Sequence, residues 1–330
     1  MLDSHNREIN YLRVSVTDRC NLHCLYCKPK EGLSEGGRDD ILSFEEIHRV
    51  IRAAVRLGIT KVRLTGGEPL VRRGLADFIR TLGEIENLTE ISLTTNGILL
   101  ASMADEIRRA GIKRINISLD SLDKGKYARI TGGGDLQAVL DGIDEACRLG
   151  FSPIKINNVA IKGFNDDEIL DFAGLARERP FQVRFIELMP FTGDGQVETG
   201  DYLSNQIVRE VIEGRYGLQE IQRQGENNSG PARIFRLNGG MGEIGFISPL
   251  SHLFCDSCNR LRLTSDGTLL SCLLYPDGID LKESLRRGCS DEELAKLLQK
   301  AIIVKPMKHQ ISPIGGRIKK CGRQMYNIGG

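Results

Sequence analysis

The sequence lacks any long apolar run. Nowhere in its 330 residues do 18 apolar residues follow one another, and the first eight residues are mostly polar and include Asp3 and Glu8. A chain of this kind has neither the apolar stretch that spans a bilayer nor the apolar core of a signal peptide. We therefore expect a soluble protein of the cytoplasm with no membrane partner.

An excess of charge of one sign is also missing. The chain has 45 Lys and Arg residues against 44 Asp and Glu residues, which leaves a net charge of +1. A nearly neutral chain does not attract nucleic acid or an anionic membrane over a broad surface. We therefore expect no nucleic-acid partner, and any anion site must be a local cluster of basic side chains.

Cysteine, in contrast, is present in nine copies that are unevenly spread. Six of them lie in two close groups, and Cys147, Cys289 and Cys321 are isolated. In a long chain without a secretion signal, such groups favour metal ligands over a disulfide framework. The isolated cysteines are better explained as small buried or surface thiols.

Between Tyr11 and about Glu187, short β-branched runs alternate with stretches of helical period, which predicts repeated βα units and a parallel sheet. We expect strands near 11–16, 61–65, 90–94, 113–119, 154–160 and 181–187, and helices near 43–57, 74–85, 100–110, 135–149 and 166–178. Ser43 begins the first helix in a sequence that is one residue short of a capping box. The expected fold class is α/β, an incomplete (β/α)6 TIM-like barrel with its functional loops at the carboxyl ends of the strands.

The pattern changes after Pro190. A glycine-rich linker at 192–195 leads to a helix near 201–214, short strands near 217–222, 232–237 and 242–247, and the second cysteine group. We therefore expect two regions. Residues 1–190 form the partial barrel, and residues 191–330 form a smaller C-terminal region that closes its open side.

The first cysteine group consists of Cys20, Cys24 and Cys27, which fall within eight residues directly after the first expected strand. Thiolates are soft ligands, and three on one loop can hold three irons of a four-iron cluster while the fourth iron stays open to another ligand. Zinc is the alternative, with His23 as the fourth ligand. Iron–sulfur is favoured because structural zinc would not explain the distinctive loops that end the other strands.

One of those loops is Gly66-Gly67-Glu68-Pro69, at the end of the second strand. Its glycines let the backbone approach a ligand closely. Glu68 is either a ligand contact or the N-cap of the next helix.

Together with the first cysteine group, this loop resembles the radical S-adenosylmethionine (SAM) superfamily, in which an aromatic residue, here Tyr26, precedes the third cysteine. The resemblance implies a cluster whose open iron chelates SAM, and a Gly-Gly-Glu-Pro loop that binds the amino group of its methionine part. Electron transfer then cleaves SAM to the 5′-deoxyadenosyl radical, while the protein orients the reactants and excludes water. The implied cofactor contacts are Tyr26, Gly67, Glu68, Ser118 and Met189, and core packing is an equal explanation for Ser118 and Met189.

The second cysteine group consists of Cys255, Cys258 and Cys272. Its spacing suits a zinc site completed by His252 as well as it suits an iron–sulfur cluster. The presence of the first group favours a second cluster, whose open iron would face the substrate.

Basic residues occupy alternate positions on several expected strands: Arg260 and Arg262, Lys61 and Arg63, and also Arg13. Such side chains are costly to bury unpaired, so they must face solvent, carboxylates or a bound anion. Arginine forks match the geometry of phosphate. A salt-bridged exterior explains any one of these residues, but the set favours a polyphosphate pocket.

The two cysteine groups, the sequence Cys258-Asn259-Arg260-Leu261-Arg262 and the terminal Gly329-Gly330 are together similar to the GTP 3′,8-cyclase family of molybdenum cofactor biosynthesis. The similarity runs from about Tyr11 to Gly330. It implies a lyase with two 4Fe-4S clusters and SAM that takes hydrogen from the ribose C3′ of GTP, after which C3′ attacks guanine C8 to give (8S)-3′,8-cyclo-7,8-dihydro-GTP. The guanine would be held by the open iron of the second cluster, and the implied GTP contacts are Arg13, Lys61, Arg63, Thr94, Lys155, Arg184, Arg260 and Arg262.

The same resemblance implies a reductant protein, a downstream cyclic pyranopterin monophosphate synthase that receives the product, and a C-terminal tail that reaches the active site, with Arg323 as a further charge. A homodimer is compatible with it. Two rival interpretations remain. A peptide-modifying radical SAM maturase would share the first cluster but need no phosphate pocket, and a zinc-binding interaction protein would hold zinc and no sulfide.

Overall fold

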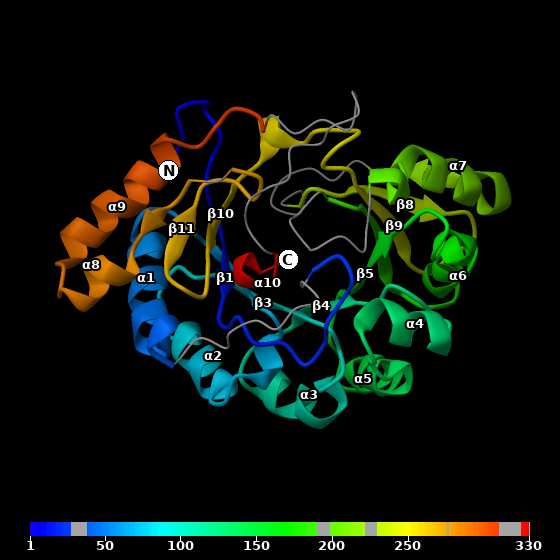
Figure 1. Cartoon of the computed structure of the whole chain (residues 1–330), viewed down its shortest axis with the longest axis horizontal. Helices are drawn as coiled ribbons and strands as arrows, with labels where there is room; N and C mark the ends of the chain where they lie inside the picture. Colours follow the sequence, from blue (N-terminus) through cyan, green and yellow to red (C-terminus); the bar gives the residue numbers. More distant parts are fainter. Residues whose placement is uncertain (28–37, 190–198, 222–229, 276, 310–324, 330) are drawn as a thin grey trace.

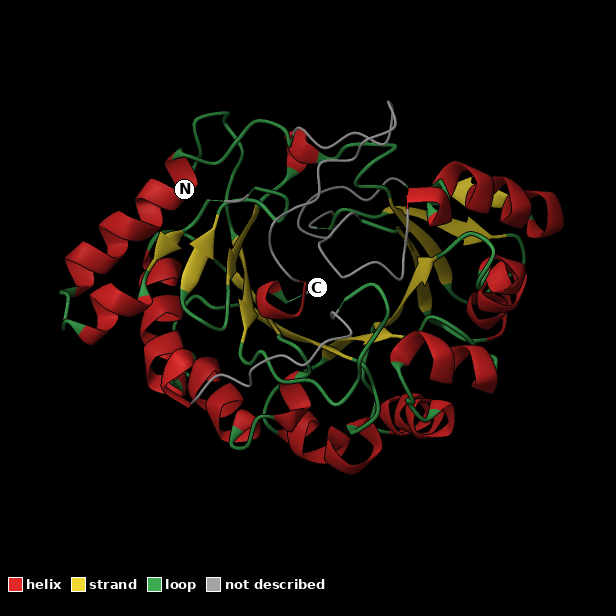
Figure 2. Ribbon diagram, in the orientation of Figure 1, coloured by secondary structure: helices red, strands yellow, loops and turns green. Residues whose placement is uncertain are grey.

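A curved sheet forms the centre of the computed structural model, which describes residues 1–27, 38–189, 199–221, 230–275, 277–309 and 325–329. Helices cover the outer face of the sheet (Figures 1 and 2). The sheet has 12 strands in the order β12-β11-β10-β1-β2-β3-β4-β5-β6-β9-β8-β7. In this order the edge strands β12 and β7 do not pair with each other within the described residues, so the barrel is open and the predicted fold class is confirmed.

The first six strands are parallel to their neighbours, as predicted. They are β1 (Tyr11–Ser15), β2 (Lys61–Thr65), β3 (Glu90–Thr95), β4 (Arg114–Ser118), β5 (Ile154–Ala160) and β6 (Gln182–Glu187). The helices that connect them are α1 (Phe44–Arg56), α2 (Leu75–Gly83), α3 (Leu100–Arg109), α4 (Lys124–Thr131), α5 (Leu136–Arg148) and α6 (Ile169–Glu178). Helix α4 was not predicted, because its eight residues carry only a weak apolar face.

The elements after residue 190 join both edges of the barrel sheet. They are α7 (Asn205–Tyr216), β7 (Leu218–Glu220), β8 (Arg233–Leu237), β9 (Glu243–Ile247), β10 (Arg260–Leu263), β11 (Thr268–Leu270), β12 (Ile279–Asp280), α8 (Lys282–Arg286), α9 (Asp291–Ile303) and α10 (Met325–Ile328). Strand β9 pairs in parallel with β6, and β10 pairs in parallel with β1. The C-terminal strands therefore extend the barrel sheet at both of its edges, β1 and β6. Residues 190 and 192–195 lie outside the described residues, so the division at 190 stays a prediction.

Alternation along the strands separates the core from the barrel interior. On β1, Leu12 and Val14 are fully buried in the main hydrophobic core, whereas Tyr11 and Arg13 line the interior cavity. Strand β2 repeats the pattern, with its valine and leucine in the core and its lysine and arginine in the cavity. Burial of the apolar side chains on the outer face of the sheet therefore fixes which side chains point into the cavity.

Helix α1 begins with a complete capping box. The Ser43 hydroxyl accepts a hydrogen bond from the Glu46 amide, and the Glu46 carboxylate accepts one from the Ser43 amide. The prediction that the box was one residue short was wrong, because Phe44 is the first helical residue and Glu46 the third. Among the described residues, no helix combines the length and the apolar character needed to cross a bilayer.

Candidate active site

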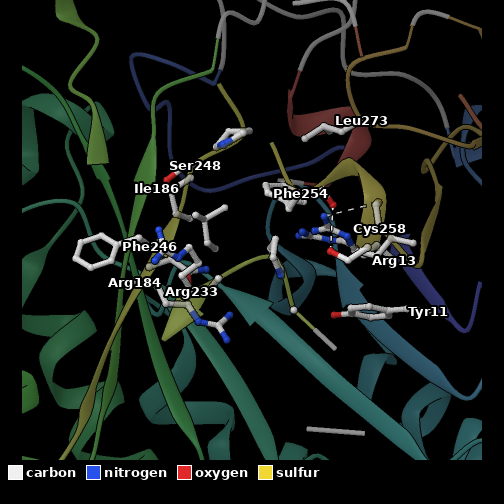
Figure 3. Close-up of a pocket in the computed structure, with 18 of the residues that line it drawn as sticks. Tyr11, Arg13, Arg184, Ile186, Arg233, Phe246, Ser248, Phe254, Cys258 and Leu273 are labelled. Atoms are coloured by element: carbon white, nitrogen blue, oxygen red, sulfur yellow. Dashed lines mark hydrogen bonds between the residues drawn. The ribbon is translucent and has the colours of Figure 1, made fainter. Parts of the chain in front are cut away.

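A cavity of about 810 Å³ occupies the interior of the open barrel. In Figure 3, Tyr11 and Arg13 lie on one wall, and Arg184 and Arg233 lie on the opposite wall. This volume is in the range of pockets that enclose a small molecule.

A row of arginines crosses three neighbouring strands on the first wall. The sheet register places Arg13 beside Arg262 of β10 on one side and beside Arg63 of β2 on the other. Burial lowers the pKa of Arg262 to about 10 and also lowers the pKa of Arg13, and the neighbouring arginines add to both effects. Cations held this close repel one another, so the row favours a bound anion.

The opposite wall adds Lys155 and Arg184. Burial lowers the pKa of Lys155 to about 6, and the charges of Arg184 and Arg63 contribute. The Arg184 Nε donates to Gln182 Oε1 at 2.7 Å, which fixes its side chain. Every predicted GTP contact lines the cavity except Thr94, which is buried at the end of β3 with no hydrogen-bond partner for its Oγ1 among the described residues.

Two further arginines of the cavity were missed. Arg114 pairs with Glu90 at 2.7 Å, and Arg233 pairs with Glu220 at 2.9 Å. Arg114 could have been found, because polar residues alternate with isoleucine along β4 as basic residues do on β1 and β2.

All three cysteines of the second group line this cavity. Burial alone would raise the pKa of the Cys258 thiol, but the charges of Arg260 and Lys305 outweigh it and lower the pKa to about 6. The thiolate, which is the form that binds metal, is therefore favoured at neutral pH. No group of three His, Cys, Asp or Glu side chains stands close enough to hold a metal ion in the described ranges, so the fit of a cluster rests on the chemistry of these donors.

The first cysteine group does not line the cavity but adjoins it. Cys27 and Cys272 pack against the same small apolar cluster of Leu270, Leu274, Met325 and Ile328. One member of each cysteine group thus contacts the same few apolar side chains. Met189 packs against this cluster as well and lines the cavity.

The loop of the first group is anchored by the unpredicted helix α4. The His23 amide donates to the Thr131 carbonyl and the Leu25 amide donates to the Ile130 carbonyl, both at 2.9 Å. Tyr26 Oη donates to Asp120 Oδ2 at 2.6 Å. Burial raises the pKa of Asp120 to about 6, although this hydrogen bond opposes the shift.

The two glycines of the Gly-Gly-Glu-Pro loop approach the backbone of the first cysteine loop. A Cβ on Gly66 would meet the Thr17 carbonyl, and a Cβ on Gly67 would meet the Arg19 carbonyl. The Gly67 amide donates to Thr17 O at 2.7 Å. In this structure the close approach that glycine permits is therefore to another loop.

Glu68 caps the short helical turn at Pro69–Val71, as one of the two sequence interpretations held. Its carboxylate accepts hydrogen bonds from Leu70 N at 3.0 Å, Thr95 Oγ1 at 2.7 Å and Asn96 N at 2.6 Å. Burial raises its pKa to about 7 despite these bonds. Asn96 in turn donates to Cys20 Sγ at 3.8 Å, so Glu68 is connected to the cysteine loop through one residue.

The C-terminal helix α10 lies in the middle of the barrel (Figure 1). The Arg262 Nη1 donates to the Gly329 carbonyl at 3.0 Å, and Gly329 is buried with a φ of +75° that favours glycine. Gly330, Arg323 and Cys321 lie outside the described residues. Ser118 ends β4 without lining the cavity, and Cys147 and Cys289 are half-buried at the edge of the main core.

Comparison with known proteins finds a matching family for each half of the chain. Residues 14–176 match the Radical SAM superfamily, and residues 181–311 match Molybdenum Cofactor Synthesis C. The GTP 3′,8-cyclase of Alkaliphilus oremlandii is 45% identical over 330 residues, which are 100% of both chains. That of Syntrophomonas wolfei subsp. wolfei is 48% identical over 331 residues, also 100% of both.

A solved structure shares the fold. Streptococcus suis SuiB bound to S-adenosylmethionine superposes with a TM-score of 0.58 at 16% identity, covering 84% of this chain and 64% of SuiB. The present chain therefore spans less than two thirds of SuiB. At this identity the likeness concerns the fold alone.

Proposed function

This chain belongs to the GTP 3′,8-cyclase family of radical SAM enzymes, and from that premise we propose that it converts GTP into (8S)-3′,8-cyclo-7,8-dihydro-GTP. The reaction would be the first step of molybdenum cofactor biosynthesis, and we assign it to the lyases. The observation that carries the proposal is the arginine row of Arg262, Arg13 and Arg63, which shares one cavity with the second cysteine group.

The cavity would hold GTP by its charges. The arginine row and Lys61 offer the forked and point charges that bind a triphosphate. Lys155 and Arg184 line the cavity from the opposite wall and would add basic side chains to those around the anion. Arg260 lies beside the second cysteine group, and Thr94, which does not line the cavity, is assigned to GTP on the family resemblance alone.

The first cluster, held by Cys20, Cys24 and Cys27, would supply the electron that cleaves SAM to the 5′-deoxyadenosyl radical. We assign Tyr26, Gly67, Glu68, Ser118 and Met189 to the cofactor on the strength of the family resemblance. The Glu68 carboxylate already accepts three hydrogen bonds from the loops that end β2 and β3. We therefore propose that Glu68 serves the cofactor by holding these loops in place. The hydrogen would come from the ribose C3′, and the new bond would join C3′ to guanine C8.

A second 4Fe-4S cluster at Cys255, Cys258 and Cys272 would hold the guanine. The low pKa of Cys258 and the position of all three thiols on the cavity wall support this assignment. His252 also lines the cavity, so a zinc site remains the competing chemistry. Iron, sulfide and zinc analysis of anaerobically purified protein separates the two, because two clusters require about eight iron and eight sulfide per chain, whereas about four of each with one zinc would contradict a second cluster.

We further propose a cytoplasmic location, a reductant protein as electron donor, and a cyclic pyranopterin monophosphate synthase as recipient of the product. A homodimer is part of the same proposal. The chemistry inside the cavity needs an electron from a reductant, but it does not depend on the location, the recipient or the homodimer.

The proposed function is tested by incubating reconstituted protein with GTP, SAM and a strong reductant. We expect 5′-deoxyadenosine and the cyclised nucleotide to form together, and neither to form without GTP. Formation of 5′-deoxyadenosine that ignores GTP and responds to a peptide would identify a maturase instead.

A further inference from the structure

The first residues of the chain fold against the second cysteine group. Asp3 Oδ1 accepts hydrogen bonds from the amides of His5 and Arg7, both at 2.9 Å, and Asp3 Oδ2 accepts one from Arg7 Nε at 2.6 Å. Only 6% of Asp3 and 7% of Arg7 is exposed. The ion pair is therefore buried, and its carboxylate fixes the direction of the guanidinium.

The remaining donors of Arg7 bind backbone carbonyls from two distant segments. Nη1 donates to the Cys255 carbonyl at 2.8 Å and to the Met307 carbonyl at 3.1 Å. Nη2 donates to the Pro306 carbonyl at 2.8 Å. One guanidinium thus joins the N-terminal segment, the first cysteine of the second group and the chain that follows α9.

Lys305 makes the equivalent contacts at the other two cysteines. It is 2% exposed, and its Nζ donates to the Ser271 carbonyl at 2.5 Å and to the Arg260 carbonyl at 2.8 Å. Ser271 directly precedes Cys272, and Arg260 follows Cys258 by two residues. Each cysteine of the group therefore has a nearby carbonyl bound by a buried cation.

These cations are costly to bury unless negative charge lies close to them. Arg7 has Asp3, but within the described part of the chain no carboxylate lies within ion-pair distance of Lys305. The anions that this neighbourhood can supply are the thiolates of the second cysteine group. A cluster held by thiolates would concentrate that negative charge where the cations are fixed.

We propose that Arg7 and Lys305 are positioning residues for the second cluster, which they serve by fixing the carbonyls beside its cysteines and by offsetting the charge of its thiolates. The proposal rests on the proposed function, because it presumes that the second group holds a cluster. It gives a role to the N-terminal segment, whose Arg7 does not line the cavity, and to Lys305 after α9, which does line it.

The test uses full-length protein in which Cys20, Cys24 and Cys27 are all replaced by Ala, so that only the second group can be reconstituted. In this parent protein, Arg7→Gln and Lys305→Gln should each speed the loss of iron to a chelator by about tenfold or more, as loss of outer-shell contacts does at other metal sites. Each should also lower the reduction potential of the cluster, because removal of a nearby positive charge disfavours the added electron. Arg7→Lys should restore the potential but only part of the iron retention, since a single ammonium cannot bind three carbonyls and a carboxylate.

A matched control is Arg286→Gln. The Arg286 guanidinium also joins a carboxylate, Glu46 at 3.2 Å, to two carbonyls, Asp39 at 2.6 Å and Ile41 at 3.1 Å, but it lies on α8 and contacts no cysteine. It should leave both iron loss and potential unchanged. In the reciprocal protein, with Cys255, Cys258 and Cys272 replaced by Ala, Arg7→Gln should leave the first cluster unchanged.

The outcomes separate this inference from the proposed function. If the parent protein binds no iron and sulfide, the second cluster itself is wrong and both proposals fall. If the parent holds a cluster and both Gln variants match it in iron loss and potential, only the positioning role is overturned, as it also is if they lose stability alone. Should Arg7→Gln not fold, Asp3→Asn keeps the cation and removes its anchor, and the expected result is faster iron loss with little change in potential.

Discussion

The two cysteine groups have the same number of thiols but opposite surroundings. The first is held by hydrogen bonds that its loop amides donate to carbonyls of α4, and it lies near the buried carboxylates Glu68 and Asp120. The second is held by Arg7 and Lys305 and lies beside the arginines of the cavity. The thiols of the first group are thus surrounded by acidic side chains, and those of the second group by basic ones.

This difference fits the two roles proposed for the groups, which are to generate the radical at the first and to hold the substrate at the second. The second group lines a space filled with positive charge, where an anionic substrate would bind, whereas the first group adjoins that space through the shared cluster around Met325. The first group lies on a single loop that is held by α4, whereas the second group is joined to Arg7, which lies 248 positions from Cys255 in the chain. We therefore expect the two groups to fail separately when their surroundings are changed.

The largest expected effect separates grouped from isolated cysteines. Cys24→Ser should abolish the formation of 5′-deoxyadenosine, because two thiolates do not hold the first cluster, while iron at the second group is retained. Chromatography of the quenched reaction and iron analysis measure the two results. Cys147→Ser is the control, since Cys147 is a half-buried thiol of α5 and should leave both unchanged. If Cys147→Ser lost as much 5′-deoxyadenosine formation as Cys24→Ser, the grouped and isolated cysteines would not differ in function as proposed.

Arg262→Ala tests the basic side of the comparison. It removes one charged fork from the arginine row, so the dissociation constant for GTP should rise by about 10- to 100-fold, while the first cluster still forms. Equilibrium dialysis with labelled GTP measures the change. Arg236→Ala, an exposed arginine on β8 outside the cavity, is the matched control. Unchanged affinity in Arg262→Ala would contradict the phosphate pocket.

Asp120→Asn tests the acidic side. Because burial raises the folded-state pKa of Asp120 from 3.8 to about 6, the wild type should lose stability as the pH rises through this window, and the variant should not. Between pH 4 and 7 the variant should therefore gain up to roughly 3 kcal/mol relative to the wild type. Urea unfolding across this range measures the difference. The matched control is Asp171→Asn, which removes an exposed carboxyl of α6 instead of a buried one. A difference in stability between Asp120→Asn and the wild type that does not change with pH would contradict this account of the Asp120 carboxyl.

The smallest expected effect concerns how α4 anchors the first cysteine loop. Gly132 and Gly150 both have φ of +71°, but a Cβ would meet the His23 carbonyl only at Gly132. Both Ala variants should lose about 1 kcal/mol of unfolding free energy from backbone strain, and Gly132→Ala should lose more. Thermal unfolding and iron retention measure this. If the two variants behave alike, the contact with His23 does not hold the loop.

Much of the fold follows from the sequence because alternation on each strand is a local property. The same rule found most of the cavity cations, and it would have found Arg114 had it been applied to β4. It could not reveal that Arg13 lies between Arg262 and Arg63, because the pairing of β1 with β10 joins segments far apart in the chain.

Other parts of the site, namely α4 and the pair Asp3 and Arg7, have no periodic pattern in the sequence that predicts their role. Helix α4 is short and weakly amphipathic, so nothing in its sequence marked it as the anchor of the first loop. Asp3 and Arg7 stand four residues apart in a polar segment, and the carbonyls that Arg7 binds lie 248 to 300 positions away. Only the folded chain brings these groups together.

The central claim is that a radical begun at the first cysteine group acts on a nucleotide held beside the second. The most direct measurement is the mass of 5′-deoxyadenosine formed from GTP deuterated at the ribose C3′. The account predicts that each molecule of 5′-deoxyadenosine gains one deuterium in the wild type. Unlabelled 5′-deoxyadenosine, formed at the same rate with or without GTP, would contradict it.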